Sequence, residues 1–147
     1  NQSEPPPIRN CAQVLIVEDN EINQLLLQAQ LELLGTAADL AGSGEAALAL
    51  LANEHYPVVF MDIEMPGMDG LETIRAIRGA PALAGRQPWI IAVTAHVFVE
   101  MREQISHAGF DDFIAKPVLI DQLSAALAKA GGAASLERSG SSRAPPC

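Results

Sequence analysis

The sequence is poor in cysteine, in positive charge and in long apolar runs, and each shortage excludes a class of protein. Its two cysteines, Cys11 and Cys147, lie outside the stretch that shows regular apolar patterning. A disulfide framework places cysteines among the core elements, so we expect a reduced, cytoplasmic setting. No apolar run approaches the roughly 18 residues that a membrane-spanning helix needs, so we expect no direct contact with a membrane.

Acidic residues outnumber basic residues two to one. The 147 residues include 9 Lys and Arg against 18 Asp and Glu, which gives a formal net charge of −9. A nucleic-acid-binding domain needs a basic face, so we expect no nucleic acid as a partner. Hydrophobic residues make up 49% of the chain, which excludes a wholly disordered protein. The chain begins with Asn1 rather than Met and shows no signal-peptide pattern, which favours a piece of a longer protein.

Composition divides the chain into three parts. Residues 1–11 contain three consecutive prolines, which favour a stiff, extended linker. Residues 131–147 are rich in Gly, Ala, Ser and Pro without an apolar period, which is typical of a flexible tail. The 119 residues between them, 12–130, suffice for one domain with its own core.

Within 12–130, short apolar runs alternate with segments of helical spacing. The runs are typical of strands buried on both faces of a parallel sheet, and they cover 14–17, 37–41, 58–61, 89–93 and 113–115. The other segments predict five helices, the first with an apolar face of Ile22, Leu25, Leu26, Ala29 and Leu33. Asn20 and Ser43 are candidate N-caps of the first two helices. The alternation predicts an α/β fold with a parallel sheet.

Polar residues follow the predicted strands. Glu18 and Asp19 come after the first strand, Asp62 after the third, Thr94 after the fourth and Lys116 after the fifth. Parallel strands end at a common edge, and ligands bind there at the switch point of strand order. Three close carboxylates need a cation, and oxygen ligands without His or Cys favour Mg²⁺ or Mn²⁺. Because a carboxylate can also attack phosphorus, the cluster suggests phosphoryl transfer to an Asp.

Four motifs in this order resemble the receiver domain of two-component response regulators, the CheY-like family. They are VLIVEDN at 14–20, MDIEMPGMDG at 61–70, VTA at 93–95 and FIAKP at 113–117. Separations of 43, 32 and 22 residues between Asp19, Asp62, Thr94 and Lys116 make the combination highly specific. The resemblance implies a doubly wound (βα)5, flavodoxin-like fold, with a five-stranded parallel sheet in the order 2-1-3-4-5 and helices on both faces.

The resemblance also implies a role for each residue at this edge. Asp62 is similar to the family's phospho-acceptor, and Asp19 and Asp62 resemble the carboxylates that hold Mg²⁺. Glu18 would contact the metal through water, and Glu64 would do so through its backbone carbonyl. Lys116 resembles the ammonium group that pairs with a phosphoryl oxygen.

Other residues match positions that regulate the family. Thr94 would bind a phosphoryl oxygen and move inward, together with Phe113 as the switch aromatic. Phe113 lacks the hydroxyl of the Tyr that is common there, so a switch would work by packing alone. Glu64 and His96 take positions that tune the lifetime of the phosphoryl group. The peptide bond between Lys116 and Pro117 is expected to be cis.

The stretches at 17–35 and 93–118 look like receiver domains of hybrid sensor histidine kinases. This resemblance implies a phosphoryl group taken from a kinase His, with the kinase domain in the same chain as one arrangement. The group would pass to a histidine phosphotransfer domain or act through a conformational output. The domain would catalyse its own phosphorylation and dephosphorylation, in the cytoplasm and tethered to an inner-membrane sensor kinase.

Other functions fit the sequence less well. A pseudo-receiver that serves only as a docking module would usually lack the acceptor, the lysine or the acidic pair, and all are present here. A Mg²⁺-dependent hydrolase with an Asp nucleophile usually carries a second Asp where this chain has Glu64. A flavin-binding domain needs a phosphate loop after the first strand, where the acidic residues of this chain would repel phosphate.

Overall fold

The computed structural model describes residues 14–65, 67–85, 87–95 and 99–137. Eleven elements follow one another along this part of the chain: β1 (Val14–Val17), α1 (Glu21–Leu33), β2 (Ala38–Ala41), α2 (Gly44–Asn53), β3 (Val58–Asp62), α3 (Gly70–Gly79), η2 (Pro81–Leu83), β4 (Trp89–Thr94), α4 (Val99–Ala108), β5 (Asp112–Ala115) and α5 (Ile120–Glu137). The predicted alternation of strands and helices is therefore confirmed.

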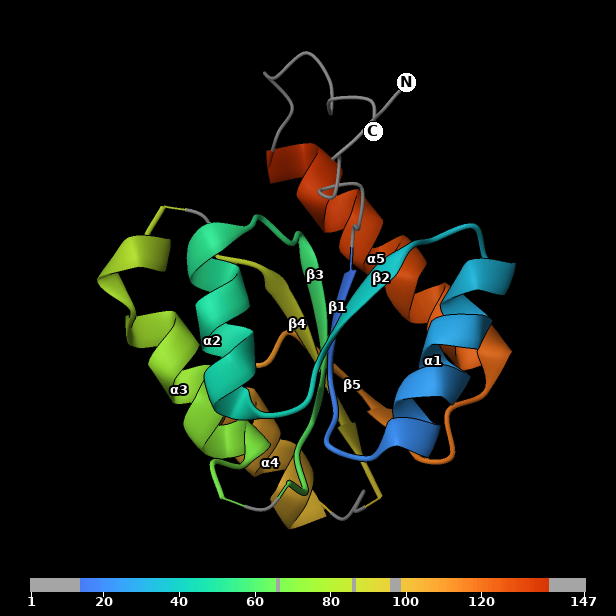
Figure 1. Ribbon diagram of the computed structural model, residues 1–147, viewed down its shortest axis with the longest axis horizontal. Helices are drawn as coiled ribbons and strands as arrows, with labels where there is room; N and C mark the ends of the chain where they lie inside the picture. The colour runs from blue at the N-terminus through green and yellow to red at the C-terminus, as the bar shows by residue number, and fades with distance from the viewer. Residues whose placement is uncertain (1–13, 66, 86, 96–98, 138–147) are drawn as a thin grey trace.

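The five strands form one parallel sheet in the order β2-β1-β3-β4-β5. Helices α2, α3 and α4 cover one face of the sheet, and α1 and α5 cover the other (Figure 1). This is the doubly wound, flavodoxin-like fold that the motifs imply. Strand order reverses between β1 and β3, so the carboxyl ends of these two strands flank the switch point where such folds bind ligands.

Each face of the sheet carries its own hydrophobic core. Alternate residues of β1 show the division, because Leu15 and Val17 pack beneath α2, α3 and α4, whereas Val14 and Ile16 pack beneath α1 and α5. All four are at most 1% exposed. Strands that are buried on both faces explain the continuous apolar runs in the sequence.

The ends of the helices follow from short-range polar contacts. The side chain of Asn20 accepts a hydrogen bond from the backbone N–H of Asn23, and Ser43 accepts one from Ala46, so both predicted N-caps are confirmed. Helix α5 continues to Glu137, seven residues past the boundary expected at 130. The predicted linker at 1–11 and residues 138–147 of the predicted tail lie outside the described residues.

The predicted apolar face of α1 is wrong. Leu27 and Leu31 are the buried residues of this helix. Four of the residues expected in the core are exposed, namely Ile22 at 75%, Leu25 at 61%, Leu26 at 53% and Leu33 at 78%. The helix carries apolar residues on more than one side, so spacing alone did not distinguish the buried side. We call Ile22, Leu25, Leu26 and Leu33 the α1 stripe.

Within the described residues, no helix combines the length and the hydropathy that crossing a bilayer requires.

Candidate functional site

Strand register brings the first pair of acidic residues together. Val17 of β1 lies beside Met61 of β3, so the next positions, Glu18 and Asp62, are neighbours at the carboxyl ends of the two strands. Both residues are buried, at 5% and 2% exposure. Carboxylate oxygens of Glu18, Asp62 and the exposed Asp19 all lie within 4.8 Å of one another. The predicted acidic cluster therefore exists in the folded chain.

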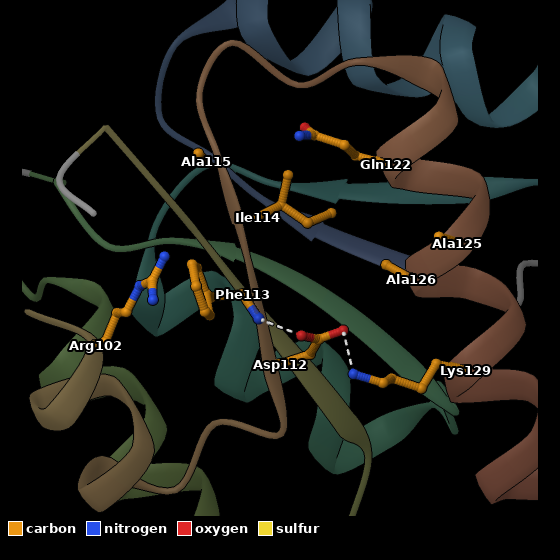
Figure 2. A pocket seen from close by; sticks show the side chains of 9 residues that line it. All are labelled: Arg102, Asp112, Phe113, Ile114, Ala115, Gln122, Ala125, Ala126 and Lys129. Atoms are coloured by element: carbon orange, nitrogen blue, oxygen red, sulfur yellow. Dashed lines mark hydrogen bonds and ion pairs between the residues drawn. The ribbon is translucent and has the colours of Figure 1, made fainter. Parts of the chain in front are cut away.

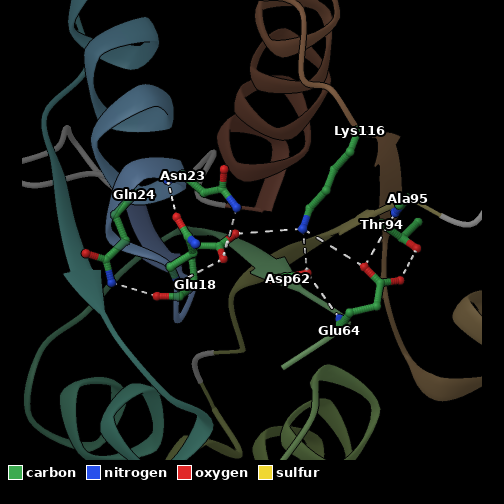
Figure 3. Close-up of polar contacts among 9 residues, drawn as sticks. Glu18, Asn23, Gln24, Asp62, Glu64, Thr94, Ala95 and Lys116 are labelled. Atoms are coloured by element: carbon green, nitrogen blue, oxygen red, sulfur yellow. Dashed lines mark hydrogen bonds and ion pairs between the residues drawn. The ribbon is translucent and has the colours of Figure 1, made fainter. Parts of the chain in front are cut away.

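The same register argument places the lysine. Thr94 of β4 lies beside Ala115 of β5, and the N–H of Lys116 donates to the carbonyl of Thr94 at 2.8 Å. The side chain of Lys116 then crosses the sheet edge to Asp62, with Nζ 3.1 Å from Oδ1, and approaches Glu18 Oε1 at 4.0 Å (Figure 3). The expected cis peptide bond between Lys116 and Pro117 is present.

Residues at the start of α1 hold Glu18 in place, and sequence reasoning missed them. The Glu18 carboxylate accepts hydrogen bonds from the backbone N–H of Asn20 at 3.1 Å and from Asn23 Nδ2 at 3.5 Å (Figure 3). The side chain of Gln24 donates to the backbone carbonyl of Glu18 at 2.6 Å. The sequence did contain a clue, because Asn23 and Gln24 lie in the first turn of the helix that follows Glu18 and Asp19.

Burial and charge shift the pKa values of this cluster. Burial raises the pKa of Glu18 to about 7; the nearby negative charge of Asp62 adds to the rise, and the hydrogen bond from Asn20 opposes it. Burial also raises the pKa of Asp62, against the opposing effect of Lys116. Burial alone would lower the pKa of Lys116, but the hydrogen bond and the charge of Asp62 outweigh it and raise that pKa. Lys116 lies within 4.0 Å of the carboxylates of Glu18, Asp62 and Glu64, so the site holds more acidic groups than one lysine balances.

Glu64 links Asp62, at the end of β3, to Thr94 and Ala95 at the end of β4. Its backbone N–H donates to Asp62 Oδ1 at 3.1 Å. Its carboxylate accepts a hydrogen bond from the Thr94 hydroxyl at 2.7 Å and one from the N–H of Ala95 at 3.4 Å, and it lies 4.0 Å from Lys116 Nζ (Figure 3). The sequence motifs implied that Glu64 contacts the metal through its backbone carbonyl and affects the lifetime of the phosphoryl group. They did not predict these side-chain contacts.

The loop after β3 is held tightly against the acceptor strand. Asp69 and Glu72 form a capping box at the start of α3. A Cβ atom on Gly70 would lie 2.7 Å from the carbonyl oxygen of Asp62 and 2.7 Å from the Cα of Ile63. Only glycine fits this close approach of helix and strand, which fixes the backbone of Asp62.

Phe113 and His96 complete the residues singled out in the sequence. Phe113 is half-buried on β5 and lines a cavity of about 430 Å³ between α4 and α5, with the Arg102 guanidinium 5.2 Å from the centre of its ring (Figure 2). Lys129 Nζ lies 3.7 Å from Asp112 in the same cavity. His96 lies outside the described residues.

The chemistry of the cluster suits a hard divalent cation. All three candidate ligand side chains offer carboxylate oxygens, which is the donor set that Mg²⁺ and Mn²⁺ prefer. The excess negative charge and the raised pKa of Glu18 are what a cation at this position would relieve. The residues present therefore fit a bound Mg²⁺.

Comparison with known sequences and structures identifies the family. Residues 14–128 match the response regulator receiver domain family. The chain is 35% identical over 131 residues to the sensor protein GacS of Pseudomonas syringae and 36% identical over 138 residues to the virulence sensor protein BvgS of Bordetella bronchiseptica. These alignments cover 88% and 92% of this chain but only 14% and 11% of the relatives.

Solved structures lead to the same result. The receiver domain of the sensor histidine kinase PA1611 from Pseudomonas aeruginosa, which has a magnesium ion in its active-site cleft, superposes with a TM-score of 0.73 at 34% identity. The alignment covers 82% of this chain and 98% of that one. The Vibrio cholerae chemotaxis protein CheY4 shares the fold, with a TM-score of 0.73 at 24% identity. This chain belongs to the receiver domain family of two-component response regulators.

Proposed function

We propose that this receiver domain accepts a phosphoryl group on Asp62 from the phosphohistidine of a kinase. The observation that supports it best is the buried Asp62 carboxylate at the sheet edge, 3.1 Å from Lys116 Nζ. In the step, a carboxylate oxygen of Asp62 forms a bond to phosphorus, and the bond from phosphorus to the imidazole nitrogen breaks. The nitrogen keeps the electron pair and takes up a proton.

Glu18, Asp19 and Asp62 are the side chains that would hold Mg²⁺, with Glu18 acting through water and Glu64 adding its backbone carbonyl. Mn²⁺ could bind in place of Mg²⁺, because it also prefers oxygen ligands. Bound there, the cation would neutralise part of the negative charge on the acceptor and on the phosphoryl oxygens. The acidic cluster supports this assignment, as does the magnesium in the related PA1611 receiver domain.

The donors around Asp62 would bind the phosphoryl oxygens. Lys116 supplies a charge, Thr94 a hydroxyl, and Glu64 and Ala95 their backbone N–H groups. Movement of Thr94 towards the phosphoryl group would vacate space on the α4 side of the sheet, where Phe113 and Arg102 lie. We propose that the change in Thr94 and Phe113 carries the output, and that Glu64 and His96 set how long the phosphoryl group persists.

The wider context is a multidomain sensor kinase. The chain is similar to part of GacS and BvgS, and it is 38% identical over 126 residues to the hybrid signal transduction histidine kinase L of Dictyostelium discoideum, covering 80% of this chain and 7% of that protein. We propose a histidine kinase domain in the same chain as the donor and a histidine phosphotransfer domain as the recipient. The domain would then work in the cytoplasm, tethered to a membrane sensor.

The α1 stripe supports a protein partner at this site. Leu26 of the stripe lines the same cavity as Glu18 and Lys116, so the exposed apolar surface continues from the acidic cluster. A partner helix that carries the reactive histidine would cover this surface. Leu25→Glu should then slow phosphotransfer from a phosphorylated partner by about tenfold and leave labelling by acetyl phosphate unchanged, because small phosphodonors need no docking surface.

The test of the acceptor uses purified protein, Mg²⁺ and acetyl phosphate, with intact mass as the readout. Wild type should gain one phosphoryl group only when Mg²⁺ is present, Asp62→Asn should gain none, and the exposed control Asp121→Asn should behave as wild type. A fully labelled Asp62→Asn would overturn the acceptor assignment. A wild type that stays unlabelled would favour a docking module that works without phosphorylation.

A further inference from the structure

The Glu64 carboxylate occupies the donors that a phosphoryl group needs. Its oxygens accept from the Thr94 hydroxyl at 2.7 Å and from the Ala95 N–H at 3.4 Å, and Oε1 lies 4.0 Å from Lys116 Nζ. In Figure 3, Lys116, Thr94 and Ala95 lie around the Glu64 carboxylate, to one side of Asp62. A carboxylate and a phosphoryl group are both anions with several acceptor oxygens, so they compete for the same donors.

The backbone of Glu64 explains why its side chain can reach so far. The N–H of Glu64 is tied to Asp62 Oδ1 at 3.1 Å, which holds the residue beside the acceptor. From there the two methylene groups carry the carboxylate across to Thr94 on the neighbouring strand β4. The side chain is 33% exposed, so it can also swing into solvent without disturbing the core.

We propose that Glu64 is an internal stand-in for the phosphoryl group, one that holds Thr94 in the resting position and must leave before Asp62 is phosphorylated. The inference rests on the proposed function and adds one step to it, the displacement of the Glu64 carboxylate before phosphorylation. Two anions cannot share the Thr94 hydroxyl, because the donor has one proton and the charges repel each other. Glu64 therefore slows phosphorylation and restrains the switch until a phosphoryl group displaces it.

Reach and charge can be separated by two substitutions. Glu64→Asp keeps the charge but is one methylene shorter, so its carboxylate no longer reaches Thr94. Glu64→Gln keeps the reach and an acceptor oxygen but loses the charge. If occupancy of the donors matters, Glu64→Asp should raise the rate of labelling by acetyl phosphate about tenfold, the size of one hydrogen bond to a charged group. Glu64→Gln should raise it less.

The opposite ranking would overturn the inference. If general repulsion of the anionic phosphodonor were the cause, Glu64→Gln would gain rate and Glu64→Asp would not. Glu32→Gln removes an exposed carboxylate from the far end of α1 and serves as the matched control, with no change expected. The double substitution with Thr94→Val sharpens the test, because the gain from Glu64→Asp should shrink once the contested hydroxyl is gone.

A second readout needs no phosphodonor. The methyl resonance of Thr94 in a ¹³C-labelled sample reports its side-chain position, and Glu64→Asp should shift it towards the position seen when beryllium fluoride and Mg²⁺ are added to wild type. An unmoved resonance would overturn the inference even if labelling proceeds normally. Conversely, if wild type labels on Asp62 while no Glu64 variant is faster, the proposed function stands and the stand-in does not.

Discussion

The two edges of the sheet each hold a salt bridge, but the groups around it differ. At the carboxyl edge, Lys116 is the one cation within 4.0 Å of three carboxylates among the described residues, those of Glu18, Asp62 and Glu64. At the amino edge, Arg78 pairs with Asp111 at 2.9 Å. The other donors of Arg78 reach neutral acceptors, namely the carbonyls of Pro88 and Gly109 and the side chain of Gln87.

The two clusters differ in how well their charges are balanced. Arg78 joins the end of α3 to the loops before β4 and β5, and its charge is matched by one carboxylate. At the carboxyl edge, by contrast, burial raises the pKa values of both Glu18 and Asp62, and Lys116 opposes the rise for Asp62. One lysine there lies within 4.0 Å of three carboxylates. Burial of negative charge that is not balanced costs stability, and the cation proposed for this site would reduce that cost.

The largest expected effect is the loss of phosphorylation when Lys116 at the carboxyl edge is removed. We expect Lys116→Ala to lower the rate of phosphorylation by acetyl phosphate about 100-fold, because it removes a fixed charge aimed at the phosphoryl oxygens. Circular dichroism should show an unchanged fold. Lys129→Ala is the matched control, since Lys129 is 64% exposed and pairs with Asp112 away from the site. A Lys116→Ala protein that labels at the wild-type rate would contradict the proposed role.

Removing Arg78 at the amino edge should lower stability rather than the rate of phosphorylation. Arg78→Ala leaves four acceptors without their charged donor, and we expect a loss of about 2 kcal/mol in the free energy of unfolding. Urea titration measures this loss, while the phosphorylation rate of the folded protein should stay unchanged. Arg75→Ala, an exposed arginine on the same helix, should change stability by less than about 0.5 kcal/mol. Equal losses from both variants would rule out the special role of Arg78.

A substitution of Asp19 tests whether the acidic cluster binds a metal ion. Asp19→Asn should weaken Mg²⁺ binding about tenfold, because one of the candidate carboxylate ligands is lost. Isothermal titration calorimetry with MgCl₂ provides the measurement, and Asp121→Asn controls for the loss of one negative charge. Binding curves that coincide for Asp19→Asn and wild type would remove Asp19 from the proposed metal ligands.

The smallest effect concerns pH. A folded pKa of about 7 for Glu18, above its ordinary value of 4.5, means that the folded state binds the proton more tightly than the unfolded state. The stability from this group is present below pH 4.5 and is lost as pH rises to about 7. Without metal, wild type should lose about 1 kcal/mol between pH 6 and 7 that Glu18→Gln does not lose. Parallel stability curves for the two proteins would contradict this.

Sequence reasoning predicted the α/β fold and the residues that meet at the carboxyl edge. It succeeded there because buried parallel strands have continuous apolar runs, and because all parallel strands end at one edge. It failed on the α1 stripe, since apolar residues lie on more than one side of that helix. It also missed Asn23 and Gln24, whose contacts with Glu18 depend on how α1 packs against β1.

The sequence by itself determined which groups this protein can use. Periodicity predicted the strands and helices, and the order of the strand-end residues along the chain predicted the acidic, hydroxyl and ammonium groups at one edge, because parallel strands end at a common edge. The order of the strands in the sheet was implied by the family resemblance of the motifs. Only the tertiary structure decided the raised pKa of Glu18, the exposed side of α1 and the contact between Glu64 and Thr94. These depend on burial and on distances between segments far apart in the chain, and neither periodicity nor spacing encodes them.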